Sequence, residues 1–395
     1  MGDCKSFRWY APTRVIFGNG SLDKLHKQKL PGKKALLVIS NGKSTKTNGS
    51  LDRTIDQLTK AGAEFVLFDK IAANPLKAVV EEGAALAKAE GTDFVVALGG
   101  GSVMDAAKNI AMLAAQDSPD LWTYAGGKTG KLQRLDHAPL PWVAISTTAG
   151  TGSEVDAAGV ITNPETNEKI GIGGYDSMFA TIAIVDPELM ATVPPRFTAY
   201  QGFDALFHCL EGYISNRASL FGDMIQRSAI EMIGKYLARA VADGSDMEAR
   251  EGLAFANTLG GYSMVVASCT SEHSMEHAMS AYHEQLPHGA GLIMISLEYY
   301  KFIISQHVCD DRFIDMARFL GKTDADKPED FIDALADLQK ACGVDDLKMS
   351  DYGITKEELP TLAVNAREAM GILMKADRKM MTDEECTGIF ERSWK

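Results

Sequence analysis

The stretch Phe94-Val95-Val96-Ala97-Leu98-Gly99-Gly100-Gly101-Ser102 decides the fold. Its apolar run is typical of a strand buried on both faces of a parallel sheet. The glycines that follow let the backbone turn sharply and approach a ligand closely. A helical pattern begins directly after them, and the backbone N–H groups at a helix start bind phosphate well. We therefore predict a phosphate-binding loop at residues 99–102, although a tight strand-to-helix turn without a ligand gives the same pattern.

A second loop of similar character lies at residues 146–154, directly after the apolar stretch 142–146. It reads Ser-Thr-Thr-Ala-Gly-Thr-Gly-Ser-Glu. Small hydroxyl side chains beside glycines can hydrogen-bond a phosphate or a ribose. Alone, this loop could simply be solvated and cap a helix. Two such loops after strands of one sheet fit a dinucleotide better than a mononucleotide.

The first half of the chain alternates continuous apolar stretches with amphipathic ones. The predicted strands lie at residues 35–40, 65–69, 94–98, 142–146 and 182–185, with helical patterns at 51–61 and 76–90 among the intervening segments. Strand, helix, strand is the order of an open, doubly wound parallel sheet. We therefore predict a Rossmann-like α/β domain over residues 1–190.

After Pro187 the pattern changes to long helices. Apolar residues recur at three- and four-residue spacing in 223–242, 248–266, 311–320 and 361–376, with few strand-like alternations. We predict an all-helical domain over residues 191–395. The fold class is thus α/β followed by α.

Length and charge limit the classes of function. A chain of 395 residues is long for one core and suggests two domains. The net charge of -13 and the lack of a basic run argue against nucleic acid or a membrane surface as partner. Apolar stretches fall short of the roughly 20 residues that span a bilayer, the first residues lack a signal-peptide pattern, and the six cysteines show no paired spacing. We expect a cytoplasmic protein with free thiols.

Two pairs of residues with helical spacing indicate a metal site. Asp204 and His208 lie four residues apart in a nearly apolar segment, so both point from one buried helix face. A buried carboxylate must be paired or bind a metal. His273 and His277 repeat the spacing, and His288 follows. Residue types alone leave His273 and His277 interchangeable, and buried hydrogen bonds without a metal would need several coincidences.

Motifs along the whole chain resemble those of the iron-containing (group III) alcohol dehydrogenases, within the dehydroquinate synthase-like superfamily. The matching motifs, in the family's order, are 12–18 (Pro-Thr-Arg-Val-Ile-Phe-Gly), Asn74-Pro75, the two loops, Asp186-Pro187-Glu188, 202–212 and Pro287-His288-Gly289. The resemblance implies a metal-dependent, NAD(P)-linked alcohol dehydrogenase or aldehyde reductase that acts on a small primary alcohol or aldehyde. It also implies that the active site lies in the cleft between the two domains.

The resemblance assigns the roles of the candidate residues. It implies metal ligation by Asp204, His208, His273 and His288, and it leaves His277 near the nicotinamide to relay a proton. Iron is the family's usual metal, and the ligand set also suits Zn²⁺ or another divalent ion. Cys209 and Cys269 flank these residues and are weaker candidates for ligands.

The cofactor contacts also come from the resemblance. The expected residues are Ser40, Asn41, Asn74, Gly99, Gly100, Gly101, Ser102, Thr147, Thr148, Thr151 and Lys169. An acid after the first strand would favour NAD by binding the ribose 2′-hydroxyl. Residues 40–46 offer two lysines and no acid, so NADP is favoured over NAD, with use of both as the alternative.

Substrate and assembly are less strongly encoded. Residues 157–160 are expected to line a small apolar pocket. Phe255, Leu259, Tyr262 and Met264 fit either this pocket or the plain core equally well. A homodimer or a higher homo-oligomer is expected, with strand 15–17 pairing across a dimer as in relatives. One alternative is a dehydroquinate-synthase-like lyase, which would need Lys and Arg clustered at the metal. The other is a metal- or nucleotide-binding protein without catalysis.

Overall fold

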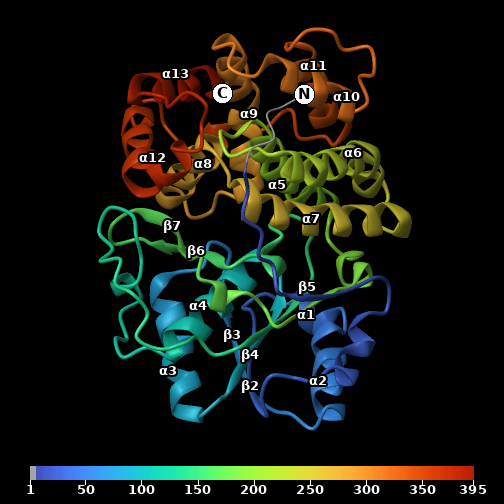
Figure 1. The fold of residues 1–395 in the computed structure, drawn as a ribbon, viewed down its shortest axis with the longest axis vertical. Coiled ribbons are helices and arrows are strands. Elements are labelled where there is room, and N and C mark those ends of the chain that lie inside the picture. Colours follow the sequence, from blue (N-terminus) through green and yellow to red (C-terminus); the bar gives the residue numbers. More distant parts are fainter. Residues whose placement is uncertain (1–5) are drawn as a thin grey trace.

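The computed structural model describes residues 6–395 and contains a six-stranded parallel sheet (Figure 1). Its strands, in spatial order, are β1 (Arg14–Phe17), β8 (Ile182–Val185), β5 (Trp142–Ser146), β4 (Phe94–Gly99), β2 (Lys34–Ser40) and β3 (Glu64–Ile71). All five strands predicted from continuous apolar stretches are present, and so is the strand expected at residues 15–17. The sixth, β1, pairs in parallel with β8 and forms one edge of the sheet.

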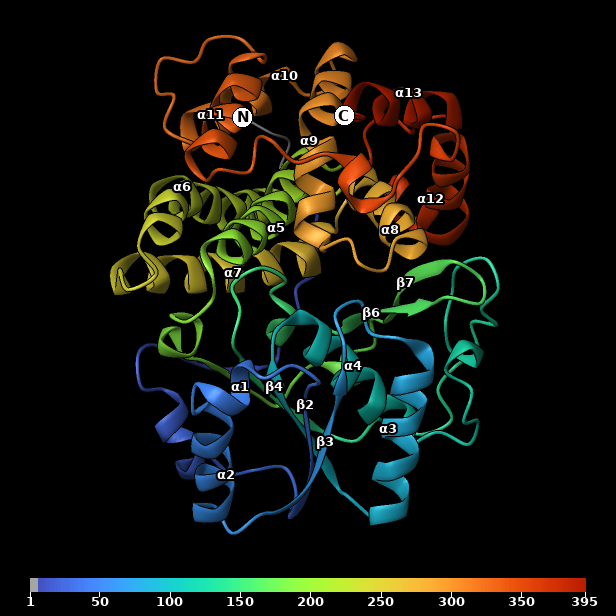
Figure 2. The same ribbon diagram turned by 180° about the vertical axis from the view of Figure 1, so that it is seen from behind.

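Helices cover both faces of this sheet. Helix α2 (Ser50–Lys60), beside the short α1 (Ser44–Thr47), lies on one side, and α3 (Lys77–Glu90) and α4 (Gly101–Ala114) lie on the other (Figures 1 and 2). Alternate residues of β2 enter different cores: Leu36 and Val38 pack toward α3 and α4, whereas Leu37 and Ile39 pack toward α2. Because both faces are buried, the strand reads as one apolar run. The predicted doubly wound architecture is confirmed.

A two-stranded hairpin was not predicted. Its strands β6 (Ala158–Asn163) and β7 (Glu168–Gly173) pair antiparallel and stand at the junction with the helical part (Figure 1). Glu168 and Lys169 are buried in β7, so this strand lacks the apolar signature of the main sheet. Its burial of charge matters for the site described below.

The second part of the chain is helical, as predicted. Its helices are α5 (Pro195–Ile214), α6 (Leu220–Ala242), α7 (Met247–Ala267), α8 (Ser271–Tyr282), α9 (His288–Ser305), α10 (Asp310–Phe319), α11 (Asp330–Ala341), α12 (Leu359–Met374) and α13 (Asp383–Ser393). All residues of α5 from Thr198 onward are buried except Gln201. No helix within residues 6–395 is both long and apolar enough to cross a bilayer.

The cysteine prediction holds for the part of the chain that the structure describes. Cys209, Cys269, Cys309, Cys342 and Cys386 are free thiols. Cys4 and the other residues at the start of the chain, on which the signal-peptide argument rested, lie outside the described residues.

Candidate metal and cofactor site

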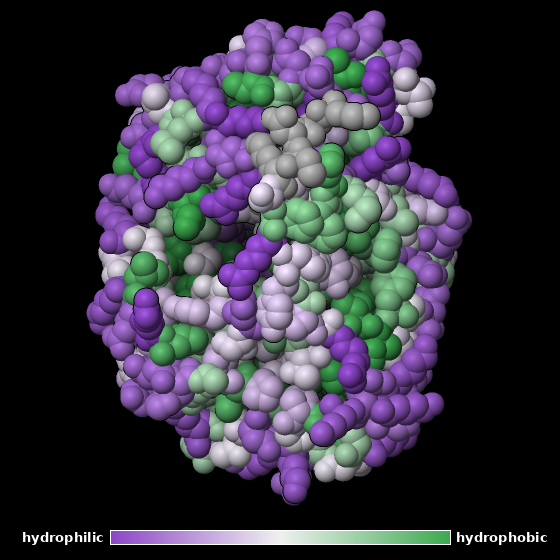
Figure 3. Space-filling model, in the orientation of Figure 1, coloured by the Kyte–Doolittle hydropathy of each residue, from purple (hydrophilic) through white to green (hydrophobic). Residues whose placement is uncertain are grey.

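A cavity of about 580 Å³ lies between the α/β part and the helical part, where the surface is hollowed in Figure 3. Gly101, Ser102 and Thr151 bring both glycine-rich loops to this cavity. The candidate metal ligands line it from the helical part, together with the proton-relay candidate His277: they are Asp204, His208, His273 and His288. The structure therefore brings residues of both predicted sites to one cavity.

Four of these residues surround a single point. Oδ1 of Asp204 lies 3.6 Å from Nε2 of His208, 3.5 Å from Nε2 of His273 and 3.5 Å from Nε2 of His288. Helix α5 supplies Asp204 and His208 one turn apart, α8 supplies His273, and His288 is the first residue of α9. His277 makes no such contact with Asp204 among the described residues.

These atoms fit a divalent ion. Ligands bound tetrahedrally at about 2.1 Å from an ion are separated from one another by about 3.4 Å, close to the observed spacing. Oδ1 of Asp204 and Nε2 of His273 are buried and have no hydrogen-bond partner within residues 6–395. Such atoms are costly to bury unless something else binds them. One carboxylate and three imidazoles suit iron, zinc or a similar metal.

The protonation states of Asp204 and His208 favour metal binding. Burial opposes the charge of Asp204, but His208 and His288 hold the pKa of its carboxyl below the ordinary value. Burial lowers the pKa of His208 to about 4, despite the opposing effect of Asp204. At neutral pH the carboxylate is therefore charged and the His208 ring neutral, which is the form of each group that binds a metal.

Two buried glutamates fix the orientation of the histidine rings. Nδ1 of His273 donates to Glu211, and Nδ1 of His288 donates to Glu276. Each bond leaves Nε2 as the free nitrogen that faces Asp204, which is how carboxylates usually orient histidine ligands. Sequence reasoning missed both glutamates. The available signal was that each follows a candidate histidine by three residues in a buried helix, where an acid needs a partner.

Lys169 lies on the metal side of the cavity. Its Nζ is 3.2 Å from Oε2 of Glu276 and 2.7 Å from Oγ of Ser280. Burial raises and the charges of His288 and Lys169 lower the pKa of Glu276, and the net shift is downward. Lys169 thereby balances the charge of the glutamate that orients His288. Its predicted contact with a cofactor stays a prediction.

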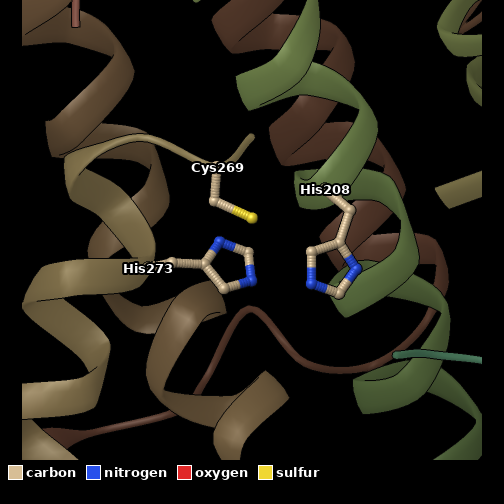
Figure 4. A group of neighbouring side chains, drawn as sticks. All are labelled: His208, Cys269 and His273. Carbon is tan, nitrogen blue, oxygen red and sulfur yellow. The ribbon is translucent and has the colours of Figure 1, made fainter. Parts of the chain in front are cut away.

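Cys269 lies beside the metal residues, as Figure 4 shows. Its sulfur points toward the space between the His208 and His273 rings, and ligand atoms of the three residues lie within 4.8 Å of one another. Burial raises the pKa of Cys269 to about 11, so the group is a neutral thiol at neutral pH. The set around Asp204 is the better metal site, and Cys209 belongs to none of the clusters of possible ligands among the described residues.

Apart from Asn74 and Lys169, the predicted cofactor residues gather at the carboxyl ends of β2, β4 and β5. Thr147 N–H donates to Gly99 O at 3.0 Å, and the two loops pack so closely that a Cβ on Gly100 would lie 2.7 Å from Thr148. Ser40 ends β2 at the same edge and Asn41 follows it, both outside the lining of the cavity. Such an edge is where open α/β sheets bind dinucleotides.

Asn74 connects the α/β part to the loop before His288. Its Nδ2 donates to Glu284 O at 3.1 Å and to Leu286 O at 3.3 Å. Asn74 also lines the cavity. The structure therefore gives it a role in holding the His288 loop, in addition to the predicted contact with a cofactor.

Comparison with known families agrees with this geometry. The family described as Iron-containing alcohol dehydrogenase matches residues 12–187, and its C-terminal part matches residues 198–394. The chain belongs to the iron-containing alcohol dehydrogenase family. It is an oxidoreductase, and the alcohol dehydrogenase interpretation is confirmed over the lyase and non-catalytic alternatives.

Individual alcohol dehydrogenases are similar over nearly the whole chain. The 1,3-propanediol dehydrogenase of Klebsiella pneumoniae is 33% identical over 368 residues, covering 91% of this chain and 92% of its own. A probable NADH-dependent butanol dehydrogenase of Bacillus subtilis is 32% identical over 370 residues, covering 92% and 93%. The crystal structure of an alcohol dehydrogenase from a halo-thermophilic archaeon of a Red Sea brine pool superimposes with a TM-score of 0.92, at 35% identity, covering 98% and 99%.

In the chain described here, the predicted small apolar residues lie on one side of the cavity. Ala157, Ala158 and Val160 line it, together with Met264 from α7. Phe255, Leu259 and Tyr262 do not: the ring of Phe255 packs on Phe17 and that of Tyr262 on Trp9. The family supports a metal and NAD as cofactors of the enzyme.

Proposed function

We propose that this alcohol dehydrogenase interconverts short primary alcohols and aldehydes with a divalent metal held by Asp204, His208, His273 and His288. The observation that carries the proposal is the position of Asp204 Oδ1, 3.5 to 3.6 Å from three Nε2 atoms. Iron is the first candidate for the metal, because the family is defined by it, and zinc is the second. The names of the relatives, which act on 1,3-propanediol and butanol, support substrates of this size.

The metal and the nicotinamide cofactor would supply the reactive groups. When bound, the metal polarises the alcohol oxygen and the nicotinamide accepts the hydride. The chain itself positions the substrate between the ligand cluster and the apolar residues 157–160. It also excludes water by burying the metal residues: the exposed fractions of Asp204, His208 and His273 are 3–4%.

His277 is our candidate for moving the proton. It lines the cavity, is buried, and its Nδ1 has no hydrogen-bond partner within residues 6–395. Burial, reinforced by Lys169, holds the pKa of His277 well below its ordinary value. The ring is therefore neutral at neutral pH and able to accept a proton released by the alcohol.

A His277→Ala variant tests this role. We expect it to retain metal and cofactor while kcat falls, by about 10²-fold or more if general base catalysis is lost. The pH profile of kcat should change shape as well. Full turnover across the pH range, with metal and cofactor bound, would show that another group moves the proton.

The cofactor site is proposed on the same basis. Gly99, Gly100, Gly101 and Ser102, with Thr147, Thr148 and Thr151, would hold the phosphates and the nicotinamide half of NAD(P). Ser40 and Asn41 would meet the adenosine, and Asn74 and Lys169 would contact the nicotinamide ribose. Lys43 and Lys46 support NADP, with NAD the alternative that the NADH-dependent relative supports.

Assembly, domains and location are also proposals. The outer edge of β1 carries no partner strand within the described chain, so it offers hydrogen-bonding groups for pairing across a homodimer. We propose two domains, residues 1–190 and 191–395, that meet at the cavity. We also propose a cytoplasmic location, consistent with the free thiols.

One experiment tests the proposed function directly. The protein is purified without oxygen, its metal content is measured, and 1-propanol, 1-butanol and 1,3-propanediol are assayed with NAD⁺ and NADP⁺. We expect one divalent ion per chain and oxidation of all three alcohols. An enzyme that holds its metal and cofactor but oxidises none of these alcohols would overturn the proposed substrate class.

A further inference from the structure

Ser268, between α7 and α8, has an unusual backbone. Its φ is 67° and its ψ is 167°. This region is essentially restricted to glycine, because a Cβ atom crowds the backbone there. A serine in this conformation is strained, and glycine would be the expected residue.

Hydrogen bonds on both sides of Ser268 hold this conformation. Its own N–H donates to Met264 O at 3.0 Å and ends α7. Two residues later, Thr270 N–H donates to Glu211 at 2.6 Å. Glu211 also orients His273, so the turn is attached to the metal site. The neighbours therefore fix the backbone, and they do not explain why the residue is serine.

The side chain of Ser268 has no structural partner. Its hydroxyl makes no hydrogen bond with any residue of the described range 6–395. Ser268 lines the cavity beside Met264 and Val265, whose side chains offer no hydrogen-bond donor. Among the described residues that the helical part contributes to this lining, Ser268 is the only one with a hydroxyl group.

We propose that Ser268 determines substrate specificity by hydrogen-bonding a second oxygen of the substrate. The preferred substrate class would be a short alcohol or aldehyde that carries another hydroxyl group, with the first oxygen at the metal site. A strained serine without internal hydrogen bonds has no advantage over glycine unless its hydroxyl binds something in the cavity. This inference rests on the proposed function and names the substrate class of the same cavity.

Two variants separate the hydroxyl from the strain. Ser268→Ala removes the hydroxyl and keeps the Cβ, whereas Ser268→Gly removes both. The metal-loaded enzymes are assayed with 1,3-propanediol and with 1-propanol, which has the same carbon chain and lacks the second hydroxyl. We expect the ratio of kcat/KM for diol over propanol to fall about three- to tenfold in both variants. Because the two substrates share one carbon chain, a general effect of the substitution on turnover cancels in this ratio.

Thermal unfolding provides a second measurement that does not depend on activity. Ser268→Gly should unfold at a higher temperature than Ser268→Ala, because glycine relieves the strain that alanine keeps. An unchanged diol-to-propanol ratio in Ser268→Ala, or a fall confined to Ser268→Gly, would overturn the role of the hydroxyl. A glycine variant no more stable than the alanine variant would overturn the strain argument. If the wild type oxidises neither alcohol, the proposed function itself fails, and this inference fails with it.

Discussion

The carboxylate of Glu276 accepts a hydrogen bond from Nδ1 of His288, the ring whose Nε2 lies 3.5 Å from Asp204. Glu276 sits on α8, between His273 and His277, and its other partner is Lys169 on β7. The bond fixes which nitrogen of His288 faces the proposed metal. Through Lys169, Glu276 also connects the hairpin β6–β7, which the sequence did not predict, to the predicted metal site.

Replacing Glu276 by Gln should weaken metal binding by about 10- to 100-fold, because the amide orients His288 less firmly and leaves Lys169 without its charged partner. Affinity is measured by competition with a chelator. Glu272→Gln is the matched control: it lies on the same helix, and its carboxylate accepts from Tyr300 and makes no hydrogen bond to a histidine ligand within residues 6–395. Equal metal affinity in wild type and Glu276→Gln, or an equal loss in the control, would contradict the orienting role.

A methyl group on Gly101 should weaken cofactor binding. The added Cβ would lie 2.2 Å from Cγ2 of Thr151, so one of the two loops must move. Overpacking of this kind costs about 1–3 kcal/mol, and Gly101→Ala should lose both stability and affinity for NAD(P)H. Fluorescence titration with NADH and urea unfolding measure the two effects. In the control Gly371→Ala, the Cβ meets only Arg367, at 4.0 Å, and both quantities should stay near the wild-type values.

The main sheet was predictable because burial on both faces requires a continuous run of apolar residues in each strand. The alternation of Leu36 and Leu37 between two cores forces every position of β2 to be apolar. The strands of the hairpin have no such apolar run. Glu168 and Lys169 are buried in β7 because each has a polar partner elsewhere in the chain, and a pattern of apolar residues cannot reveal partners that are distant in sequence.

The candidate site was predictable to a similar degree. Helical spacing placed Asp204 with His208 and His273 with His277, but it could not tell which histidine of the second pair would meet Asp204. That outcome depends on where α5 and α8 approach each other, which is a tertiary property. The orienting role of Glu211 was hidden for the same reason, since its partner His273 lies 62 residues away.

The choice between NAD and NADP can be tested at the end of β3. Asp69 Oδ2 lies 2.7 Å from Lys46 Nζ, and this hydrogen bond is the main reason why the pKa of Asp69 is lowered. The charged Asp69 therefore neutralises a lysine that would otherwise attract a 2′-phosphate. In Asp69→Asn we expect the ratio of kcat/KM for NADP⁺ over NAD⁺ to rise roughly two- to fivefold, as for other exposed ion pairs.

The control for this coenzyme test is Asp56→Asn, which removes an exposed carboxylate paired with Lys60 on α2. Its coenzyme ratio should equal that of the wild type. A ratio that falls or stays constant in Asp69→Asn would place the adenosine away from Lys46 and weaken the preference for NADP inferred from residues 40–46.

Asp377 should make the enzyme less stable as pH rises. One of its carboxylate oxygens accepts from Ser271 N–H at 3.2 Å, and the other is buried without a hydrogen-bond partner within residues 6–395. Burial raises the pKa of Asp377 to about 7, whereas an unfolded chain ionises this group near pH 3.9. Between about pH 4 and pH 7 the folded state thus holds a proton that the unfolded state has released. The free energy of unfolding should therefore fall as pH rises through this window, by up to a few kcal/mol.

Asp377→Asn should remove this dependence and be more stable than the wild type at pH 8, measured by urea unfolding of the metal-loaded enzyme from pH 5 to pH 8. The exposed carboxylate of Asp52 provides the control, and a wild-type slope retained in Asp377→Asn would assign the pH dependence to another group.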